Sequence, residues 1–556
     1  MAMGAEKLVE SLDSHDVDYV FGVCGDTSVD LYRAFGEQED LEHVLTRDER
    51  SAAFMADAYA RLSGKPGVCE GPSGGGATYI LPGLSEANDS SVPLVALNTT
   101  IPVGYRDRGV LTELDQKSLM DPVTTWNTSV DTAEQVPRMI RQAFREATTG
   151  RPGATHLSFP MDVLNEETDA ETYADENVAE YPPYRTVPES ERLDAAADVV
   201  ESAEDPVIVA GGGIHSSQAW ETVRDFAERV GVPVAQSLTS AGCIGDGPYD
   251  IGVVGENGSR EYANEIVQDA DALLLFGTAV ESVWTEKWSQ PSDGEMTIVH
   301  ADIEPASIGK NYETDVALPG DLKSIVEALD DRIGDIGPKW DPNDLAARHK
   351  DWRSNFEAAM ESDRFPMRPE RVVADAAAVL DDDAVFISDP GTPTPFFASL
   401  YPFSEPGRNW VVNRAHGALG YSIPGAIGAS KACPDQQVVA LSGDGSFGIS
   451  VGELETYGRL DIPATIVVFN NGAFSWIEAG QQSYDEFSFG VEFSSLDYAS
   501  LVEKFGVAGF SVESADEFKS QFRAAVETDG PALVDVPTQS LPDIEDVPVD
   551  WLEPDE

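Results

Sequence analysis

Residues 441–476 read LSGDGSFGISVGELETYGRLDIPATIVVFNNGAFSW, and this stretch decides the fold. It begins at the end of an apolar run, residues 438–441, that is typical of a buried strand. A Gly-Asp-Gly turn follows at 443–445, where two glycines free the backbone and one carboxylate leaves the turn. Apolar side chains then recur at helical spacing over residues 449–460, which predicts a helix.

A second run of β-branched residues, 464–469, predicts another strand, which stops at Asn470-Asn471. If the two strands are parallel neighbours, the Asp444 and Asn471 loops lie at the sheet edge where open α/β sheets bind ligands. Carboxylate and amide oxygens suit Mg²⁺, which takes the rest of its shell from water and from a cofactor or substrate phosphate. Each motif alone is common in turns and loops, but together they predict a site for a diphosphate and Mg²⁺.

The spacing of the two motifs resembles the thiamin diphosphate (ThDP) motif, because 24 residues separate Gly445 from Asn470 and a strand precedes each loop. This resemblance implies that Mg²⁺ is held by Asp444, the side chain of Asn471 and the backbone carbonyl of Ala473. It also implies that the cofactor is contacted by residues of the same loops, namely Gly443, Asp444, Gly445, Ser446, Asn471, Ala473 and Phe474.

The rest of the chain alternates helical patterns with short apolar strands, which predicts an α/β fold of doubly wound parallel sheets. Strands are expected, for example, at 17–23, 92–97 and 155–159. The length of 556 residues leaves room for several domains, each with its own core. The resemblance and the composition together predict a pyrimidine-binding domain at 1–165, a central Rossmann-like domain at 190–332, a diphosphate-binding domain at 366–542 and an acidic tail at 543–556.

Glu49 is the candidate catalytic residue. Residues 46–61 read as a strand end that runs into an Ala-rich helix, with Glu49 in the first turn. On its own, a carboxylate at this position matches the helix dipole. The run resembles the Arg-His-Glu segment of the acetolactate synthase and pyruvate oxidase group, which implies that Glu49 bonds the aminopyrimidine ring of the cofactor. Asp48 stands where the family has His.

Two further loops of the first domain resemble family loops. Residues 71–78 look like the Ser-Gly-Pro-Gly-Ala-Thr-Asn loop, although they could equally form a plain turn into a helix. Residues 111–116 lie where acetolactate synthases carry a run that reaches the substrate. This position implies a substrate contact for Thr112.

In the third domain, residues 385–388 predict a strand, and the loop after it resembles a diphosphate-binding loop. The resemblance implies cofactor contacts by Asp389, Gly391 and Thr392, with a further hydroxyl offered by Thr394. Residues 414–424 resemble the Gly-x-Met-Gly element that bends the cofactor. This match implies cofactor contacts by His416, Ala418 and Leu419, with Leu419 as the wedge, although a leucine here could equally be core.

The central domain of the related enzymes often holds FAD, and residues 300–305 resemble a piece of that domain. Ala279 stands where the flavin-contacting Arg is expected, which argues against FAD. The glycine turn 211–213 precedes a helix and could hold a phosphate, but the dinucleotide fingerprint is not met. A structural role for this turn is the simpler interpretation.

The charge balance is extreme, with 99 acidic and 36 basic residues and a formal net charge of -63. This charge argues against nucleic acid and anionic membranes as partners. At about 1 M salt the Debye length falls to roughly 3 Å, which makes such a surface tolerable, so we expect a cytoplasmic protein of a salt-rich cytosol.

Four distant cysteines without a Cys-x-x-Cys pair argue against zinc and disulfides, and no apolar run reaches transmembrane length.

The chain thus resembles the acetolactate synthase, pyruvate oxidase and benzoylformate decarboxylase superfamily, and within it the acetolactate synthase large subunit. We expect ThDP- and Mg²⁺-dependent decarboxylation of a 2-oxo acid with carboligation. A pyruvate oxidase-like enzyme and a 2-hydroxyacyl-CoA lyase or decarboxylase stay open, as does a catalytically silent ThDP-fold subunit. The family binds its cofactor between subunits, which implies a homodimer or homotetramer.

The acceptor pocket is where the sequence departs from the family. Trp476 falls on a Met of the acetolactate synthases, which implies a reshaped pocket and a substrate contact by Trp476, unless the ring packs under its loop. No two of the seven His residues are adjacent, unlike the His pair of the decarboxylases that release acetaldehyde.

Overall fold

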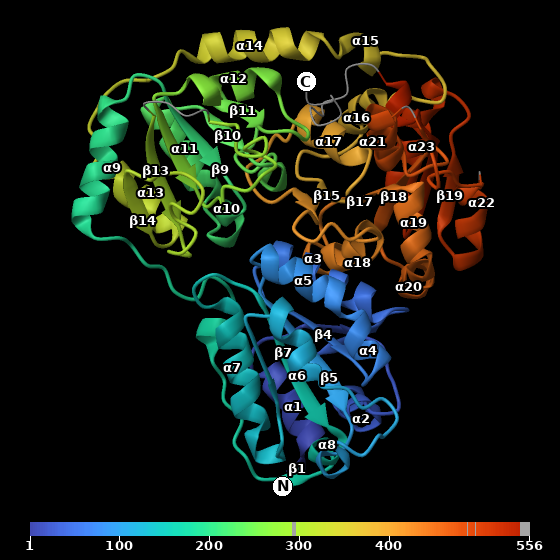
Figure 1. The fold of residues 1–556 in the computed structure, drawn as a ribbon. Coiled ribbons are helices and arrows are strands. Elements are labelled where there is room, and N and C mark those ends of the chain that lie inside the picture. Colours follow the sequence, from blue (N-terminus) through green and yellow to red (C-terminus); the bar gives the residue numbers. More distant parts are fainter. Residues whose placement is uncertain (292–295, 486, 495, 545–556) are drawn as a thin grey trace. The chain divides into compact units, whose positions relative to one another are not determined.

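The computed structural model describes residues 1–291, 296–485, 487–494 and 496–544 (Figure 1). They form two compact units. The first unit contains Met1–Tyr184, Asn413–Asp435 and Ser450–Ile462, and the second contains Arg185–Val412, Gln436–Ile449 and Pro463–Glu556. From residue 545 onward, the predicted acidic tail lies outside the described residues.

A six-stranded parallel sheet forms the centre of the first unit, in the order β3-β2-β4-β5-β7-β6. Its strands are β2 (Tyr19–Gly22), β3 (Glu42–Leu45), β4 (Gly67–Gly71), β5 (Leu94–Thr100), β6 (Trp126–Ser129) and β7 (Ala154–Pro160). β4, β5 and β7 are buried along their whole length, as expected for parallel strands with helices on both faces. The strands expected at 17–23, 92–97 and 155–159 are β2, β5 and β7.

Helix α3 is the central helix of this unit, because nearly every residue along it is buried. Its neighbours include α18, which comes from a distant part of the chain. Gly428 of α18 meets the backbone of α3 so closely that a Cβ there would overlap the carbonyl oxygen of Met55. The helices of the first unit include α1 (Gly4–Asp13), α2 (Val29–Glu37), α3 (Glu49–Ser63), α4 (Gly75–Tyr79), α5 (Leu81–Asp89), α6 (Gln116–Met120), α7 (Val136–Thr148), α18 (Ser422–Ala432) and α20 (Leu454–Leu460).

The second unit contains two further parallel sheets. The central one has the order β11-β10-β9-β12-β13-β14, which is the doubly wound order 3-2-1-4-5-6 when its strands are numbered along the chain. Its strands are β9 (Pro206–Ala210), β10 (Val234–Gln236), β11 (Asp250–Val253), β12 (Ala272–Phe276), β13 (Thr297–Asp302) and β14 (Val316–Pro319). Its helices include α9 (Ser190–Ser202), α11 (Trp220–Val230), α12 (Glu261–Asp269) and α13 (Leu322–Asp330).

The last sheet repeats the topology of the first. Its order is β16-β15-β17-β18-β20-β19, with every neighbouring pair parallel. The strands are β15 (Val385–Ser388), β16 (Trp410–Val412), β17 (Val438–Gly443), β18 (Ala464–Asn470), β19 (Ala508–Ser511) and β20 (Ala532–Pro537). The helices of this part include α14 (Pro342–Ser354), α16 (Pro369–Ala377), α17 (Pro393–Leu400), α19 (Asp444–Ser450), α21 (Ser475–Asp485), α22 (Tyr498–Val502) and α23 (Ala515–Val526).

The prediction of three doubly wound parallel sheets is confirmed, but the single helix predicted for residues 449–460 is wrong. The chain forms α19, a 3-10 turn at Val451–Glu453 and then α20. Polar side chains hold the break, since the Ser450 hydroxyl donates to the Gly420 carbonyl at 2.6 Å and Glu453 accepts from the Arg47 amide at 3.0 Å. Across the described ranges, no helix is long and apolar enough to span a membrane.

The contact between α18 and α3 predicts a stability effect. Gly428→Ala places a methyl group against the Met55 carbonyl, so we expect the free energy of unfolding to fall by about 1–3 kcal/mol. Gly36→Ala is the control, since Gly36 lies in α2 with no atom within 4 Å of its added Cβ, and we expect a gain of about 0.4–1 kcal/mol. Urea titration of both variants measures the difference. Equal stability of Gly428→Ala and the unsubstituted chain would contradict the close packing.

Candidate functional site

The Asp444 and Asn471 loops meet at the carboxyl ends of β17 and β18. The two strands are parallel neighbours, with Gly443 opposite Phe469. The Asp444 carboxylate accepts hydrogen bonds from the Gly472 amide at 2.6 Å and from the Gly445 amide at 2.9 Å. Asp444 is 4% exposed, and this burial raises the pKa of its carboxyl to about 6 although the backbone amides oppose the shift. One carboxylate is thus held beside the turn that follows β18.

That turn carries the other two residues predicted to bind Mg²⁺. The Asn471 side-chain oxygen accepts from the Ala473 amide at 3.2 Å. A short antiparallel bridge joins Ala473 to Glu492, and its two hydrogen bonds use the Gly472 carbonyl and the Phe474 amide. The Ala473 carbonyl is therefore left out of this pairing. Carboxylate, amide and carbonyl oxygens are the kind of ligand that Mg²⁺ prefers, so the residues present fit a magnesium site.

Aromatic rings pack over the Gly-Asp-Gly turn. Phe474 and Phe493 meet edge to face with their centroids 4.6 Å apart, and a Cβ at Gly445 would overlap the Phe474 ring. Gly445 is therefore required by packing as well as by the turn. Phe493 was not found from the sequence, because it belongs to no motif and reaches Phe474 only through the bridge. Trp476, the predicted substrate contact, is half-buried and packs against the core of its unit.

The loop after β15 is hydrogen-bonded to the end of β17 and leads into helix α17. Asp389 is fully buried, and its carboxylate accepts from the Ser442 hydroxyl at 3.1 Å, which ties the end of β15 to the end of β17. The Thr394 hydroxyl, expected to face the diphosphate, donates instead to the Asp389 carbonyl at 2.6 Å. Gly391 and Thr392 stand directly before α17. The first turn of this helix offers no free N–H group, because Pro393 and Pro395 have none and the Thr394 amide donates to the Gly391 carbonyl at 3.1 Å.

Glu49 is the first residue of α3, as the sequence predicts, and Asp48 caps this helix through the amides of Arg50 and Ser51. Glu49 is 9% exposed, and burial raises the pKa of its carboxyl, with Asp48 and Glu70 adding to the shift. Two glycines make room for the side chain. A Cβ on Gly76 would lie 3.0 Å from Glu49 Oε1, and one on Gly71 would lie 3.3 Å from Glu49 Cγ.

Thr112 lies in the same unit, at one end of a series of hydrogen-bonded hydroxyl groups. Its Oγ1 is 2.8 Å from Ser73 Oγ, and the Thr27 hydroxyl, which accepts from the Ser73 amide at 3.1 Å, lies 2.7 Å from Thr99 Oγ1. The backbone of Thr112 has a φ of 65°, a left-handed conformation that β-branched residues rarely adopt. Such strain is often found at functional sites, which supports a functional role for this loop. The sequence offered no signal for Thr27.

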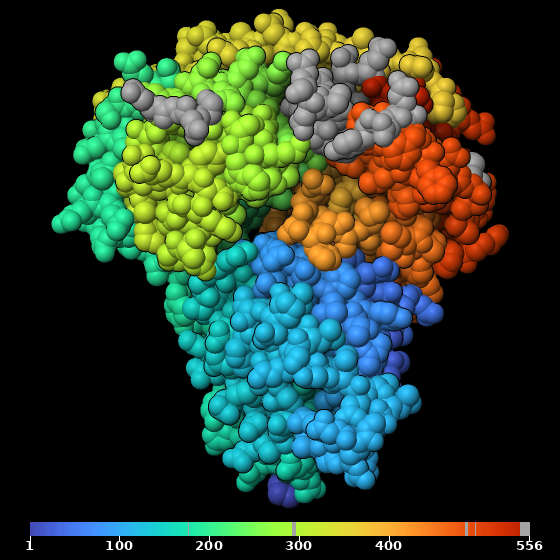
Figure 2. Space-filling model, viewed as in Figure 1, coloured from blue at the N-terminus to red at the C-terminus, as the bar shows by residue number. Residues whose placement is uncertain are grey.

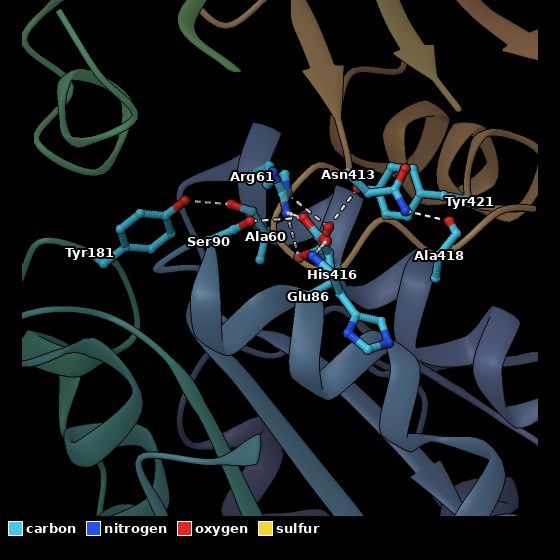
Figure 3. A network of polar contacts seen from close by, with 10 residues as sticks. Ala60, Arg61, Glu86, Ser90, Tyr181, Asn413, His416, Ala418 and Tyr421 are labelled. Atoms are coloured by element: carbon cyan, nitrogen blue, oxygen red, sulfur yellow. Dashed lines mark hydrogen bonds and ion pairs between the residues drawn. The ribbon is translucent and has the colours of Figure 1, made fainter. Parts of the chain in front are cut away.

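The loop with His416, Ala418 and Leu419 is anchored to α3 and α5 by a buried polar network (Figure 3). Arg61 donates to Asp57 at 2.7 Å and to Glu86 at 3.1 Å. Tyr421 donates to Asp57 at 2.5 Å, and the amide of His416 donates to Glu86 at 2.8 Å. The carboxylates of Asp57 and Glu86 thus connect the buried guanidinium of Arg61 to His416 and Tyr421 of the loop.

The side chains of that loop differ in their surroundings. His416 is exposed, with Nδ1 3.3 Å from the Ser85 hydroxyl. The Ala418 carbonyl accepts from the Asn413 side chain at 2.5 Å, and Leu419 is half-buried. The anchoring carboxylate Glu86 was missed from the sequence, because it belongs to no motif and its partner loop lies more than three hundred residues away.

Two amides of the glycine turn after β9 donate to backbone carbonyls. The Gly211 amide donates to the Phe276 carbonyl at 2.9 Å, and the Gly213 amide donates to the Gly277 carbonyl at 2.8 Å. A Cβ on Gly211 would also lie 2.6 Å from atoms of Gly277 and Thr278, and one on Gly213 would lie 2.6 Å from the Cα of Gly277. These contacts explain the glycines by close packing of two loops. Whether FAD binds stays untested, and Ala279 argues against it because it stands where the flavin-contacting Arg is expected.

Comparison with known proteins places these loops in a family. Residues 2–119 match the N-terminal TPP binding domain of thiamine pyrophosphate enzymes, residues 193–329 match the central domain, and residues 389–536 match the C-terminal TPP binding domain. The probable acetolactate synthase large subunit of Methanocaldococcus jannaschii is 33% identical, over 97% of this chain and 93% of that protein.

Bacterial relatives give the same result. The acetolactate synthase of Mycobacterium bovis is 29% identical, over 96% of this chain and 87% of its own. The acetolactate synthase isozyme 1 large subunit of Escherichia coli is 28% identical, over 96% of this chain and 93% of its own. The chain therefore belongs to the thiamine pyrophosphate enzyme family and is similar, over nearly its whole length, to acetolactate synthase large subunits.

Proposed function

We propose that this ThDP-dependent decarboxylase and carboligase removes CO₂ from a 2-oxo acid and joins the remaining acyl fragment to a second 2-oxo acid. The product would be an acetohydroxy acid, as the name acetolactate synthase says of the relatives. The observation that carries this proposal is the bond from the Gly472 amide to Asp444, which joins the two loops of the cofactor motif. Homodimer or homotetramer formation belongs to the same proposal.

We assign Mg²⁺ to Asp444, the Asn471 side chain and the Ala473 carbonyl. A single carboxylate leaves the ion one net positive charge, which offsets part of the negative charge of a diphosphate. Water and phosphate oxygens would complete its shell, as Mg²⁺ usually requires.

The diphosphate is assigned to the backbone around two helix starts. Thr392 and Gly391 precede α17, and Gly443, Gly445 and Ser446 surround the start of α19. β15 and β17, from which these helices follow, are parallel neighbours, so both helix starts face the same sheet edge. At the start of α19, N–H groups favour negative charge through hydrogen bonds and the helix dipole. At α17, which begins Pro-Thr-Pro, this role falls to the amides of Gly391 and Thr392.

When bound, ThDP supplies a thiazolium ring that accepts the electron pair left behind when CO₂ departs. The chain's own contribution is a carboxyl group that exchanges a proton with the aminopyrimidine ring, and we assign this role to Glu49. The raised pKa of Glu49 suits the role, because a carboxyl that holds its proton more tightly can donate it back. His416, Ala418 and Leu419 are assigned to cofactor binding, with Leu419 as the wedge, and Thr112 and Trp476 to the substrate.

The reaction is tested by incubating the protein with ThDP, Mg²⁺ and a panel of 2-oxo acids at multimolar KCl. We expect mass spectrometry to find CO₂ release together with an acetohydroxy acid. An aldehyde, an acyl phosphate or an acyl-CoA as the main product would overturn the carboligase proposal, and no turnover with any 2-oxo acid would favour a silent subunit.

Glu49→Gln should keep ThDP binding but lower the rate of CO₂ release by at least about 100-fold, because the amide cannot exchange the proton. Calorimetry measures the binding and a coupled CO₂ assay measures the rate. Glu261→Gln is the matched control, since Glu261 is also the first residue of a helix but is exposed. Near-normal turnover of Glu49→Gln would refute the catalytic role.

Asp444→Ala should abolish the Mg²⁺-dependent part of ThDP binding, because the only carboxylate of the assigned metal site is lost. A chelator should have the same effect on the unsubstituted protein. Asp383→Ala removes an exposed carboxylate of the same unit and should leave the affinity unchanged. If titration calorimetry gave equal ThDP affinities for Asp444→Ala and Asp383→Ala, the metal assignment would be wrong.

A further inference from the structure

A cavity of about 410 Å³ lies within the second unit, away from the residues assigned to ThDP. Its wall is formed by the segment after β10, by β11, by α14 and by the end of α17 with residues 401–403. Figure 1 shows α14 running beside α12, and Figure 2 shows this yellow segment on the surface of the molecule. The volume falls within the range of roughly 300–1,000 Å³ that small-molecule sites occupy.

Two arginines line this cavity. Arg260 pairs with Asp250 at 3.3 Å and donates to the Ser399 carbonyl at 3.2 Å. Arg353 donates to the Leu400 carbonyl at 3.2 Å, but among the described residues no carboxylate lies within 4.0 Å of its guanidinium. In a chain with 99 acidic residues, a half-buried arginine without an ion pair is unexpected. Burial and the charge of Arg260 lower the pKa of Arg353, whereas the more distant carboxylates of Glu357 and of Asp246, which also lines the cavity, oppose this shift. A bound anion in direct contact would stabilise the charged form of Arg353.

His349 supplies a further donor. The Tyr262 oxygen lies 3.2 Å from His349 Nδ1. When the Tyr262 hydroxyl donates its proton to Nδ1, the neutral ring of His349 carries its own proton on Nε2. Burial and the two arginines lower the pKa of His349 to about 4, so the ring is neutral at pH 7.

A purely structural role explains only part of this arrangement. Both arginines donate hydrogen bonds to carbonyls at the carboxyl end of α17. A positive charge at this end of a helix interacts favourably with the helix dipole. Each such contact uses one N–H group, whereas a guanidinium has five. The remaining donors of Arg353 border a space larger than an inorganic anion, next to the rings of Tyr401 and Phe403. Capping of α17 therefore does not account for the cavity or for the donors that Arg353 presents to it.

We propose that this cavity binds a small organic molecule through its oxyanion group, a phosphate or a carboxylate, held by Arg353, Arg260 and His349. The guanidinium of Arg353 would take the planar two-oxygen contact that such groups form with arginine. The rings of Tyr401 and Phe403 would contact the organic part.

Titration calorimetry on the full chain, with ThDP and Mg²⁺ present so that the diphosphate loops do not compete, tests this proposal with potassium phosphate and with succinate as probes. Arg353→Gln should weaken binding of the recognised probe by at least about tenfold, because a charge-assisted contact is lost. Arg348→Gln is the control, since Arg348 lies on the same helix but its side chain is 46% exposed and faces Glu265 at 3.7 Å. A phosphate response identifies a phosphorylated ligand, and a response to succinate alone identifies a carboxylate.

A second measurement needs no substitution. Arginine-selective modification by phenylglyoxal, mapped by peptide mass spectrometry, should be slowed at Arg353 but not at Arg348 when the bound probe is present. Absence of binding by both probes, equal affinity in Arg353→Gln and Arg348→Gln, or unprotected Arg353 would each overturn the proposal.

Discussion

Parallel pairing of β17 with β18 is the constraint on which the cofactor motif depends. The register that sets Gly443 opposite Phe469 brings the next residues of both strands to the same sheet edge. There the Asp444 carboxylate takes the Gly472 amide as a partner, so a carboxylate and the following turn are held together before any ligand binds. Such preorganisation lowers the cost of binding a metal and a diphosphate. The hydrogen bond from the Ser442 hydroxyl to Asp389 extends the same arrangement to β15.

The first unit is held by a different kind of interaction, the buried network around Arg61. Removing one partner from a buried ion pair costs about 3–5 kcal/mol, because the other charge stays buried and unpaired. Here one guanidinium satisfies Asp57 and Glu86, and these carboxylates in turn accept from Tyr421 and the His416 amide. Every member depends on the others, so the loop from 413 to 421 has few alternative positions. The assigned wedge, Leu419, lies within this fixed loop.

Most arginines of this chain lie at or near the surface, and among the described residues only Arg61 and Arg260 are buried. Arg61 serves the network of the first unit, and Arg260 joins Asp250 of β11 to the end of α17. Arg353 stands apart, because its contact is a carbonyl and its remaining donors border a cavity. The same residue type thus stabilises a core in two places and borders a cavity in a third. Among the described residues, Arg61 and Arg260 have a carboxylate within 4.0 Å and Arg353 does not.

Local patterns determined the sheets, the ends of β15, β17 and β18, the start of α3 at Glu49 and the pairing of the Asp444 and Asn471 loops. These features follow from periodicity and from glycine or proline at strand ends, which act over a few residues. Only the tertiary structure decided that Asp389 and Thr394 bond within the chain, that residues 413–435 pack on α3, and that Arg260, His349 and Arg353 share one cavity. Most of these contacts join segments that are far apart along the chain, such as Ser442 with Asp389 and Arg260 with α14, and no local pattern records which side chains the folded backbone brings together.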